Sequence, residues 1–170
     1  MAIDFTPQMK KEYTILCPDI FPTHMELLSE IFHQFGYRLK VLKYEGKEVI
    51  EAGLKYLHND MCYPAICTAG QQIYALTCGD YDPHKCALIQ FQTGGGCRAS
   101  NYIFLLRKAL KNMGMEYVPV ISLSFGGYEK YSGFKITPMM VLLATAMTAM
   151  SIVVRVPLQM RDQRSWPMVF

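Results

Sequence analysis

The chain has 170 residues, of which 51% are hydrophobic and only 18% charged, which predicts one domain with a substantial core and some apolar surface that meets a partner. Its net charge of +3 is small and its lysines are spread over the sequence, so nucleic-acid binding is not expected. The sequence does not open on a basic region followed by an apolar run, so a signal peptide is not expected either. The six cysteines are then predicted to be reduced thiols in a cytoplasm, where metal binding or catalysis explains them better than disulfides.

The first part of the sequence predicts two strands separated by a helix. Residues 1–12 are polar and mixed, which indicates an extended lead-in. Residues 13–17 form a short β-rich run that is typical of a buried strand. A capping-box pattern that begins at Thr23, followed by apolar residues at helical spacing, predicts a helix that ends at Gly36. Residues 37–43 alternate apolar and basic side chains, which indicates a strand near a sheet edge.

The middle of the sequence predicts two helices around a short strand. Residues 47–55 have the pattern of a short helix, and residues 56–60 are interpreted as a short strand. The next helix is expected to start close to Pro64 and to run to Gly79, because proline suits a first helical turn. Cys62 therefore stands just before a helix, at the edge of the sheet to which the short strand would deliver it.

The alternation of strands and helices continues after this point and decides the predicted fold class. Residues 86–91 form a β-rich run, residues 100–113 a helical pattern that ends at Gly114, and residues 118–123 a last β-rich run. This order implies a parallel sheet. We therefore predict an α/β fold with a doubly wound, mainly parallel sheet of four or five strands and helices on both faces. The first strand is expected to be central, flanked by the second and the fourth.

The end of the chain differs in character from the rest. Residues 139–154 are apolar or small, and this run is shorter than the roughly 20 residues that span a bilayer, so a membrane protein is not expected. We predict an α/β domain at residues 1–138, and an apolar helix with a tail at residues 139–170 that packs on this domain or on a partner. A second copy of the chain is one candidate partner.

A glycine-rich turn between the strand at 86–91 and the following helix is chemically distinctive. Gly94, Gly95 and Gly96 allow a sharp turn that leaves backbone N–H groups free to bind, and Cys97 and Arg98 follow directly. The start of a helix and a neighbouring arginine both favour the thiolate form of a cysteine, which binds metals and attacks electrophiles. The alternative is a phosphate-type loop with an incidental cysteine.

Three cysteines are expected at the carboxyl edge of the predicted sheet, where α/β proteins bind ligands. Cys17 ends the first strand, Cys62 precedes a helix, and Cys97 follows the fourth strand. Three thiolates at one edge suit an iron–sulfur cluster. Zinc is an alternative that lacks the usual paired spacing, and a Cys97 nucleophile with His58 as its base is another. The remaining cysteines are expected to be small buried apolar groups: Cys67, Cys78 and Cys86.

Several unusual strings occur together and in one order: NDMCYPA at 59–65, GDYD at 79–82, QTGGGCRASNY at 92–102 and VPVISL at 118–123. Together they resemble the dehydratase-like portion of the CoA-substrate-specific enzyme activases, which are relatives of the 2-hydroxyacyl-CoA dehydratase subunits and of double-cubane iron–sulfur proteins. The resemblance covers most of residues 10–138. It does not extend to the residues that follow 154, and the chain contains no ATPase signature.

The resemblance implies a cytoplasmic, oxygen-sensitive iron–sulfur protein of anaerobic metabolism with a 4Fe-4S cluster. Its role would be low-potential electron transfer or reductive acyl-CoA chemistry, as a part of an enzyme system rather than a complete enzyme. The implied partners are an ATP-hydrolysing activator module or a larger activase chain, and an acyl-CoA. Cys62 and Cys97 match the family's cysteine-containing strings and are carried over as candidate cluster ligands, whereas Cys17 rests on the topology alone.

Two further expectations complete the sequence-based description. The backbone N–H groups at Gly94, Gly95 and Gly96 are expected to donate hydrogen bonds to cluster sulfides or to a substrate carbonyl, and Arg98 to offset negative charge. Neither the patterns nor the resemblance identifies a catalytic residue. The alternative function is a non-catalytic structural or interaction module of a larger assembly.

Overall fold

The computed structural model describes residues 3–58, 60–93, 96–123, 131–146 and 149. The chain divides into two compact units, Met1–Lys135 and Ile136–Phe170. The first unit contains the sheet and the candidate site, and the second begins shortly before an apolar helix.

The first unit is built on a four-stranded, all-parallel sheet with the strand order β2-β1-β3-β4. The strands are β1 (Thr14–Pro18), β2 (Arg38–Leu42), β3 (Cys86–Phe91) and β4 (Val120–Leu123). The predicted α/β class, the parallel sheet and the central first strand are confirmed. The strand with alternating basic residues is β2, which lies at an edge of the sheet as expected.

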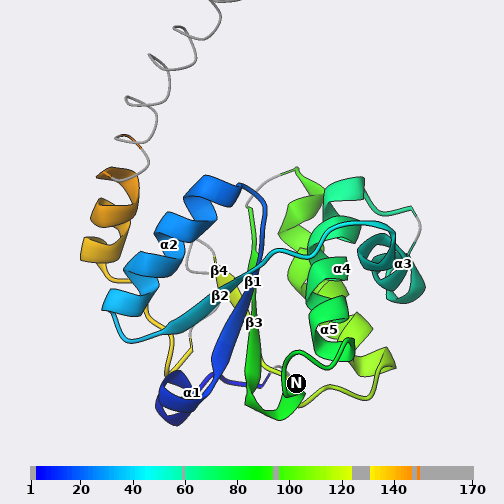
Figure 1. Cartoon of the computed structure of the whole chain (residues 1–170), viewed down its shortest axis with the longest axis horizontal. Coiled ribbons are helices and arrows are strands. Elements are labelled where there is room, and N and C mark those ends of the chain that lie inside the picture. Colours follow the sequence, from blue (N-terminus) through cyan, green and yellow to red (C-terminus); the bar gives the residue numbers. More distant parts are fainter. Residues whose placement is uncertain (1–2, 59, 94–95, 124–130, 147–148, 150–170) are drawn as a thin grey trace, which may run out of the picture. The chain divides into compact units, whose positions relative to one another are not determined.

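Helices cover both faces of this sheet (Figure 1). Their bounds, with those of two 3-10 turns, are α1 (Pro7–Glu12), α2 (Pro22–Gln34), α3 (Lys47–Tyr56), α4 (Tyr63–Thr77), η1 (Pro83–Lys85), η2 (Arg98–Asn101) and α5 (Tyr102–Asn112). In Figure 1, α2 lies on one side of the sheet, α4 and α5 lie on the other, and α3 lies outside α4. The doubly wound arrangement follows from this, because the chain reverses its direction along the sheet after β2.

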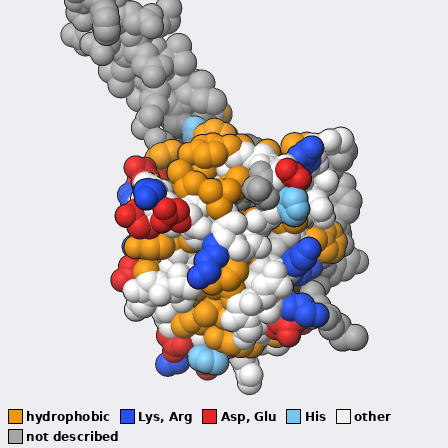
Figure 2. Space-filling model, turned by 90° about the vertical axis from the view of Figure 1, so that its right-hand side faces the viewer, with side chains coloured by type: hydrophobic (Ala, Val, Ile, Leu, Met, Phe, Trp, Pro, Cys, Tyr) orange, Lys and Arg blue, Asp and Glu red, His pale blue; other side chains and the backbone are white. Residues whose placement is uncertain are grey.

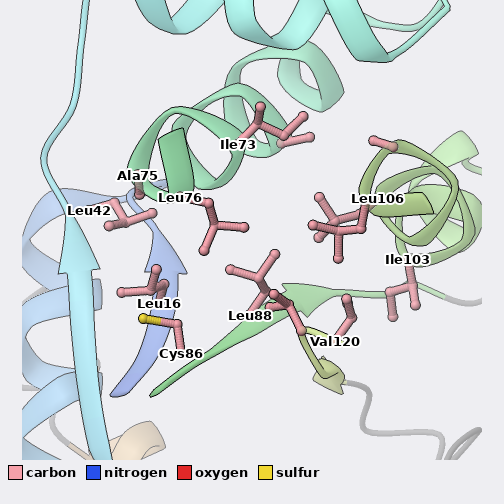
Figure 3. Packing of buried hydrophobic residues seen from close by; sticks show 14 of the residues in the cluster. Leu16, Leu42, Ile73, Ala75, Leu76, Cys86, Leu88, Ile103, Leu106 and Val120 are labelled. Carbon is pink, nitrogen blue, oxygen red and sulfur yellow. The ribbon is translucent and has the colours of Figure 1, made fainter. Parts of the chain in front are cut away.

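One part of the core lies between the sheet and the α4–α5 layer (Figure 3). It is a cluster of buried apolar side chains to which each of these elements contributes: Leu16, Leu42, Leu88 and Val120 from the strands, Ile73 and Leu76 from α4, and Ile103 and Leu106 from α5. Alternate strand residues therefore face α4 and α5, and the residues between them face α2.

Two glycines bring α3 and α4 into close contact. A β-carbon on Gly70 would overlap the carbonyl oxygen of Val49, and one on Gly53 would overlap the carbonyl oxygen of Ile66. Glycine lowers the helix propensity of both segments. The structure explains why glycine is present despite its low helix propensity: a larger residue at either position would force the two helices apart.

Two local predictions from the sequence are wrong. The expected extended lead-in contains the helix α1, because Thr6 accepts a hydrogen bond from the backbone N–H of Met9 and a proline occupies the first turn. The expected short strand at residues 56–60 is not a strand in the described residues, since Tyr56 ends α3 and Asp60 lies in a turn. Burial of the Leu57 side chain in the core cluster accounts for its apolar character instead.

The second unit contains a helix that begins at Pro138, next to the apolar run predicted at residues 139–154. Residues 138–146 are helical, and the N–H of Val141 donates to the carbonyl of Thr137. The predicted continuation through Val154 lies largely outside the described residues, and the packing partner of this helix stays a prediction. Within the described ranges, no helix is long and apolar enough to cross a membrane.

Candidate thiol site at the carboxyl edge

The sheet opens between its two central strands at their carboxyl ends. β1 pairs with β2 as far as Pro18, and β3 pairs with β4 as far as Phe91. The pairing between β1 and β3 stops earlier, at Leu16 and Leu88. The helices that follow these two strands leave to opposite faces, so this is the topological switch point at which open α/β sheets bind ligands.

Two neighbouring glutamines of α4 bind the backbone around this opening. Gln72 is fully buried, and its side-chain Nε2 donates to the carbonyl oxygen of Ile89 at 2.8 Å and to that of Leu16 at 3.4 Å. Gln71 accepts from the backbone N–H of Asp19 at 2.8 Å and donates to the carbonyl of Tyr44 at 3.1 Å. These side chains replace the sheet hydrogen bonds that the parting strands no longer make.

Cys62 lies at the edge of the α4–α5 layer. It is the N-cap residue of α4 and half-buried, and its Sγ lies 2.8 Å from the hydroxyl oxygen of Tyr102, the first residue of α5. Burial raises the pKa of the Tyr102 phenol, and the hydrogen bond to Cys62 and the proximity of the Cys62 and Cys97 sulfurs act in the same direction. The phenol is therefore held in its protonated form, which can donate a hydrogen bond to sulfur.

Cys97 is exposed and lies at the start of η2. Its Sγ accepts from the backbone N–H of Ala99 at 3.5 Å. The η2 turn is attached to the sheet through Gln92, whose Nε2 donates to the carbonyl of Ser100 at 2.9 Å and whose Oε1 accepts from the Ser122 hydroxyl at 2.7 Å. The position of Cys97 is thus fixed relative to the ends of β3 and β4.

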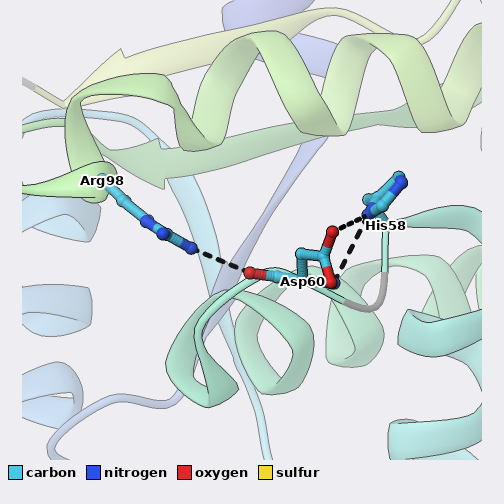
Figure 4. Close-up of polar contacts among 3 residues, drawn as sticks. All are labelled: His58, Asp60 and Arg98. Atoms are coloured by element: carbon cyan, nitrogen blue, oxygen red, sulfur yellow. Dashed lines mark hydrogen bonds and ion pairs between the residues drawn. The ribbon is translucent and has the colours of Figure 1, made fainter.

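A second hydrogen bond joins the segments that carry Cys62 and Cys97. The Nη1 of Arg98 donates to the backbone carbonyl of Asp60 at 2.8 Å (Figure 4). The two segments are therefore joined by the Tyr102–Cys62 and Arg98–Asp60 contacts, and we call Cys62 and Cys97 the thiol pair. Arg98, which the sequence predicted to offset negative charge, binds the backbone two residues before Cys62.

Cys17 lies in a different environment from the thiol pair. Its side chain is fully buried, and its Sγ lies 4.0 Å from the Sδ of Met25 in α2. Burial, with a smaller contribution from Asp19, raises the pKa of this thiol from 9.0 to about 12. Across the described residues, no group of three or more histidine, cysteine or acidic side chains is placed to hold a metal ion. The structure does not bring Cys17 together with the thiol pair.

The other residues singled out in the sequence have varied positions. Gly96 is exposed, and a β-carbon there would have no neighbour within 4 Å, whereas Gly94 and Gly95 lie outside the described residues. His58, the candidate base for Cys97, is exposed, and its Nδ1 lies 3.2 Å from the Oδ2 of Asp60 (Figure 4). Its observed partner is thus a carboxylate.

The three remaining cysteines share no single environment. Cys86 is buried at the start of β3, and Cys67 is half-buried within α4, where it raises the pKa of the Tyr63 phenol. Cys78 is exposed at the C-cap of α4, which corrects the expectation that it is a buried apolar group. The reason is local, because the buried face of α4 ends at Leu76.

Hydrophobic side chains also reach the surface around this edge. Figure 2 shows a face on which hydrophobic groups gather toward the upper end, between charged side chains. Phe21, which follows β1, and Tyr63, the first residue of α4, are each 62% exposed, and Ile20 is 37% exposed. The edge is therefore more apolar than its cysteines and glutamines alone suggest.

The sequence reasoning did not identify several polar residues that support the site. Gln72 and Gln90 are buried within otherwise apolar segments, and Gln90 donates to the hydroxyl of Thr68 at 3.1 Å. The signal for them was the presence of glutamine inside apolar runs, since a buried amide needs a hydrogen-bonding reason. The sequence assigned no role to Tyr102, which is the last residue of the QTGGGCRASNY string.

Comparisons of the chain with protein-family models, with curated proteins and with solved structures give no match. The chemistry of the site is therefore read from its own side chains. Two thiols offer soft ligands that prefer iron–sulfur clusters, zinc or copper, and a phenol offers a hydrogen-bond donor to one of the sulfurs.

Proposed function

We propose that this chain binds an iron–sulfur cluster of the 4Fe-4S type through Cys62 and Cys97. In this proposal it forms the cluster-binding part of a CoA-substrate-specific enzyme activase or 2-hydroxyacyl-CoA dehydratase-like system. The observation that carries the proposal is that Cys62 contacts the Tyr102 hydroxyl, while Cys97 lies five residues before Tyr102 at the start of the adjoining turn. The resemblance of the strings around the two cysteines gives independent support.

The residues present fit a part of a cluster site. The thiol pair combines one exposed and one half-buried thiol, and a donor contacts each sulfur, the Ala99 N–H at Cys97 and the Tyr102 hydroxyl at Cys62. Clusters of this type are commonly held by four cysteine thiolates, so the pair supplies half of such a set. Arg98 places a positive charge on the same segment.

Cys17 is the third candidate ligand, and its environment sets a condition on that role. To reach a cluster at the thiol pair, its side chain would have to leave the packing against Met25 and lose a proton that burial retains up to high pH. We therefore assign the remaining iron positions to ligands from outside the thiol pair, such as a partner chain or a substrate group.

The proposed role follows from the chemistry that such a cluster supplies when bound, which is one-electron transfer at low potential. The chain's own residues contribute ligand sulfurs, hydrogen bonds to those sulfurs and an apolar surrounding that limits water. We assign it an ATP-hydrolysing activator module or a larger activase chain as the electron-donating partner, an acyl-CoA as the substrate class, and the cytoplasm of an anaerobic cell as its location.

The test is reconstitution of the full chain with iron and sulfide in the absence of oxygen. We expect a brown protein with broad visible absorbance that bleaches on reduction, and loss of this absorbance in the double variant Cys62→Ser/Cys97→Ser. The matched control is Cys67→Ser/Cys78→Ser, which alters two cysteines of the same helix segment. A colourless wild-type chain after reconstitution would contradict the proposal and favour the non-catalytic interaction module.

A further inference from the structure

We propose that Tyr102 is a positioning residue, which holds the Cys62 sulfur by a hydrogen bond and thereby fixes the two cysteine segments relative to each other. Its effect on a bound cluster rests on the function proposed above, whereas its effect on the two segments does not. The contact that carries the inference is the 2.8 Å separation between the Tyr102 hydroxyl oxygen and the Cys62 Sγ.

The position of Tyr102 in the chain explains how this contact links the segment of Cys97 to that of Cys62. Tyr102 begins α5 and directly follows η2, the turn whose N-cap is Cys97. The backbone N–H of Ser100 donates to the carbonyl of Cys97 at 3.2 Å, and the Ser100 hydroxyl donates to the same carbonyl at 2.8 Å. The Tyr102 hydroxyl is therefore connected to Cys97 through a short, internally bonded turn, and reaches across to α4.

Arg98 makes a second connection between the same two segments. Its guanidinium donates to the carbonyl of Asp60, and Asp60 precedes Cys62 by two residues. The segment 97–102 thus contacts the segment 60–62 at two points, at the Asp60 carbonyl and at the Cys62 sulfur. We call these two hydrogen bonds the bridge. Two separated contacts restrict rotation as well as translation, so the bridge sets the spacing and the orientation of the thiol pair.

The nature of the donor adds an electrostatic role to the structural one. A phenol is a good hydrogen-bond donor and a metal-bound thiolate is a strong acceptor, so the bond strengthens when the Cys62 sulfur carries negative charge. Hydrogen bonds to ligand sulfurs stabilise the reduced cluster and raise its reduction potential. Removal of the Tyr102 hydroxyl should then make the potential more negative without removing a ligand.

The chain provides its own control for this hydroxyl. Tyr63 is also a tyrosine whose pKa a cysteine of α4 raises, but it is 62% exposed and that cysteine, Cys67, lies on its own helix. The variants Tyr102→Phe and Tyr63→Phe each remove one oxygen atom and keep the ring. They differ in whether the lost hydroxyl contacts the other cysteine segment, as the Tyr102 hydroxyl does.

The first measurement uses the full chain without metal and follows backbone hydrogen exchange by mass spectrometry. We expect Tyr102→Phe to speed exchange in both segments, 60–66 and 97–101, by about threefold to tenfold, as for the loss of one hydrogen bond. Tyr63→Phe should leave the segment 97–101 unchanged. Unchanged exchange in Tyr102→Phe, or equal effects of both variants on 97–101, would overturn the inference.

The second measurement uses the reconstituted chain and separates the inference from the proposed function. We expect Tyr102→Phe to keep the iron content of the wild type and to shift the reduction potential in the negative direction, with no shift in Tyr63→Phe. An unchanged potential in Tyr102→Phe would overturn the inference. If the wild type binds no cluster while exchange in both segments still rises, the bridge stands and the proposed function falls.

Discussion

A β-carbon on Gly70 in α4 would overlap the backbone carbonyl oxygen of Val49 in α3. The reciprocal relationship holds for Gly53 in α3, whose β-carbon would overlap the carbonyl of Ile66 in α4. The two helices therefore meet backbone to backbone. Because Cys62 is the N-cap of α4, the packing of α3 against α4 also supports one half of the thiol pair.

The first prediction concerns this helix contact. Gly70→Ala and Gly53→Ala should each lower the free energy of unfolding by about 2 kcal/mol or more, because the overlap outweighs the gain in helix propensity of up to about 1 kcal/mol. Urea unfolding followed by circular dichroism measures the change. Gly96→Ala, at a position with no neighbour within 4 Å, is the matched control and should change stability by less than about 0.5 kcal/mol. An alanine variant at residue 70 as stable as the wild type would show that the helices do not meet this closely.

The second prediction concerns the pH dependence of stability in the metal-free chain. Burial raises the pKa of Cys17 from 9.0 to about 12 in the folded state, so its contribution is fully present below pH 9 and is lost as the pH rises toward 12. The free energy of unfolding should fall with a slope that approaches about 1.4 kcal/mol per pH unit for this one thiol. Cys86, whose pKa burial raises to about 11, adds to the fall.

The variant Cys17→Ala isolates the contribution of this residue. We expect a smaller decline of stability between pH 9 and 11 than in the wild type, measured by urea unfolding under reducing conditions. Parallel curves for the wild type and Cys17→Ala would mean that the Cys17 thiol ionises as readily in the folded chain as in the unfolded one.

The strand order was predictable from the sequence because few topologies satisfy its constraints. Helical segments between β-rich runs require parallel strands, and right-handed crossovers then leave few strand orders. The short strand at 56–60 was predicted wrongly because five residues are too few to show whether apolar side chains recur at strand or helix spacing. The apolar residue in this stretch, Leu57, is buried in the core between the sheet and the α4–α5 layer. The helix α1 was missed because residues 7–12 lack an apolar stripe, and none of them is buried.

The candidate site was only partly accessible to sequence reasoning. Because Cys17 lies near the end of a strand, the sequence predicted that it is at the carboxyl edge of the sheet. The sequence did not predict toward which face of the sheet its side chain points. That face depends on register, since Leu16 faces α4 and the next residue must face α2. The contact between Cys62 and Tyr102 joins residues 40 positions apart, and no pattern in one sequence reports such a pair.

The measurement that tests the central claim most directly is the iron content of single cysteine variants after anaerobic reconstitution. If Cys62 and Cys97 hold one cluster, Cys62→Ser and Cys97→Ser should each lower bound iron and sulfide severalfold below the wild type, because the pair supplies half of a four-thiolate ligand set. Cys86→Ser, which changes a buried cysteine at the opposite end of β3, should retain the wild-type content. Equal iron content in Cys97→Ser and Cys86→Ser would contradict a cluster shared by Cys62 and Cys97.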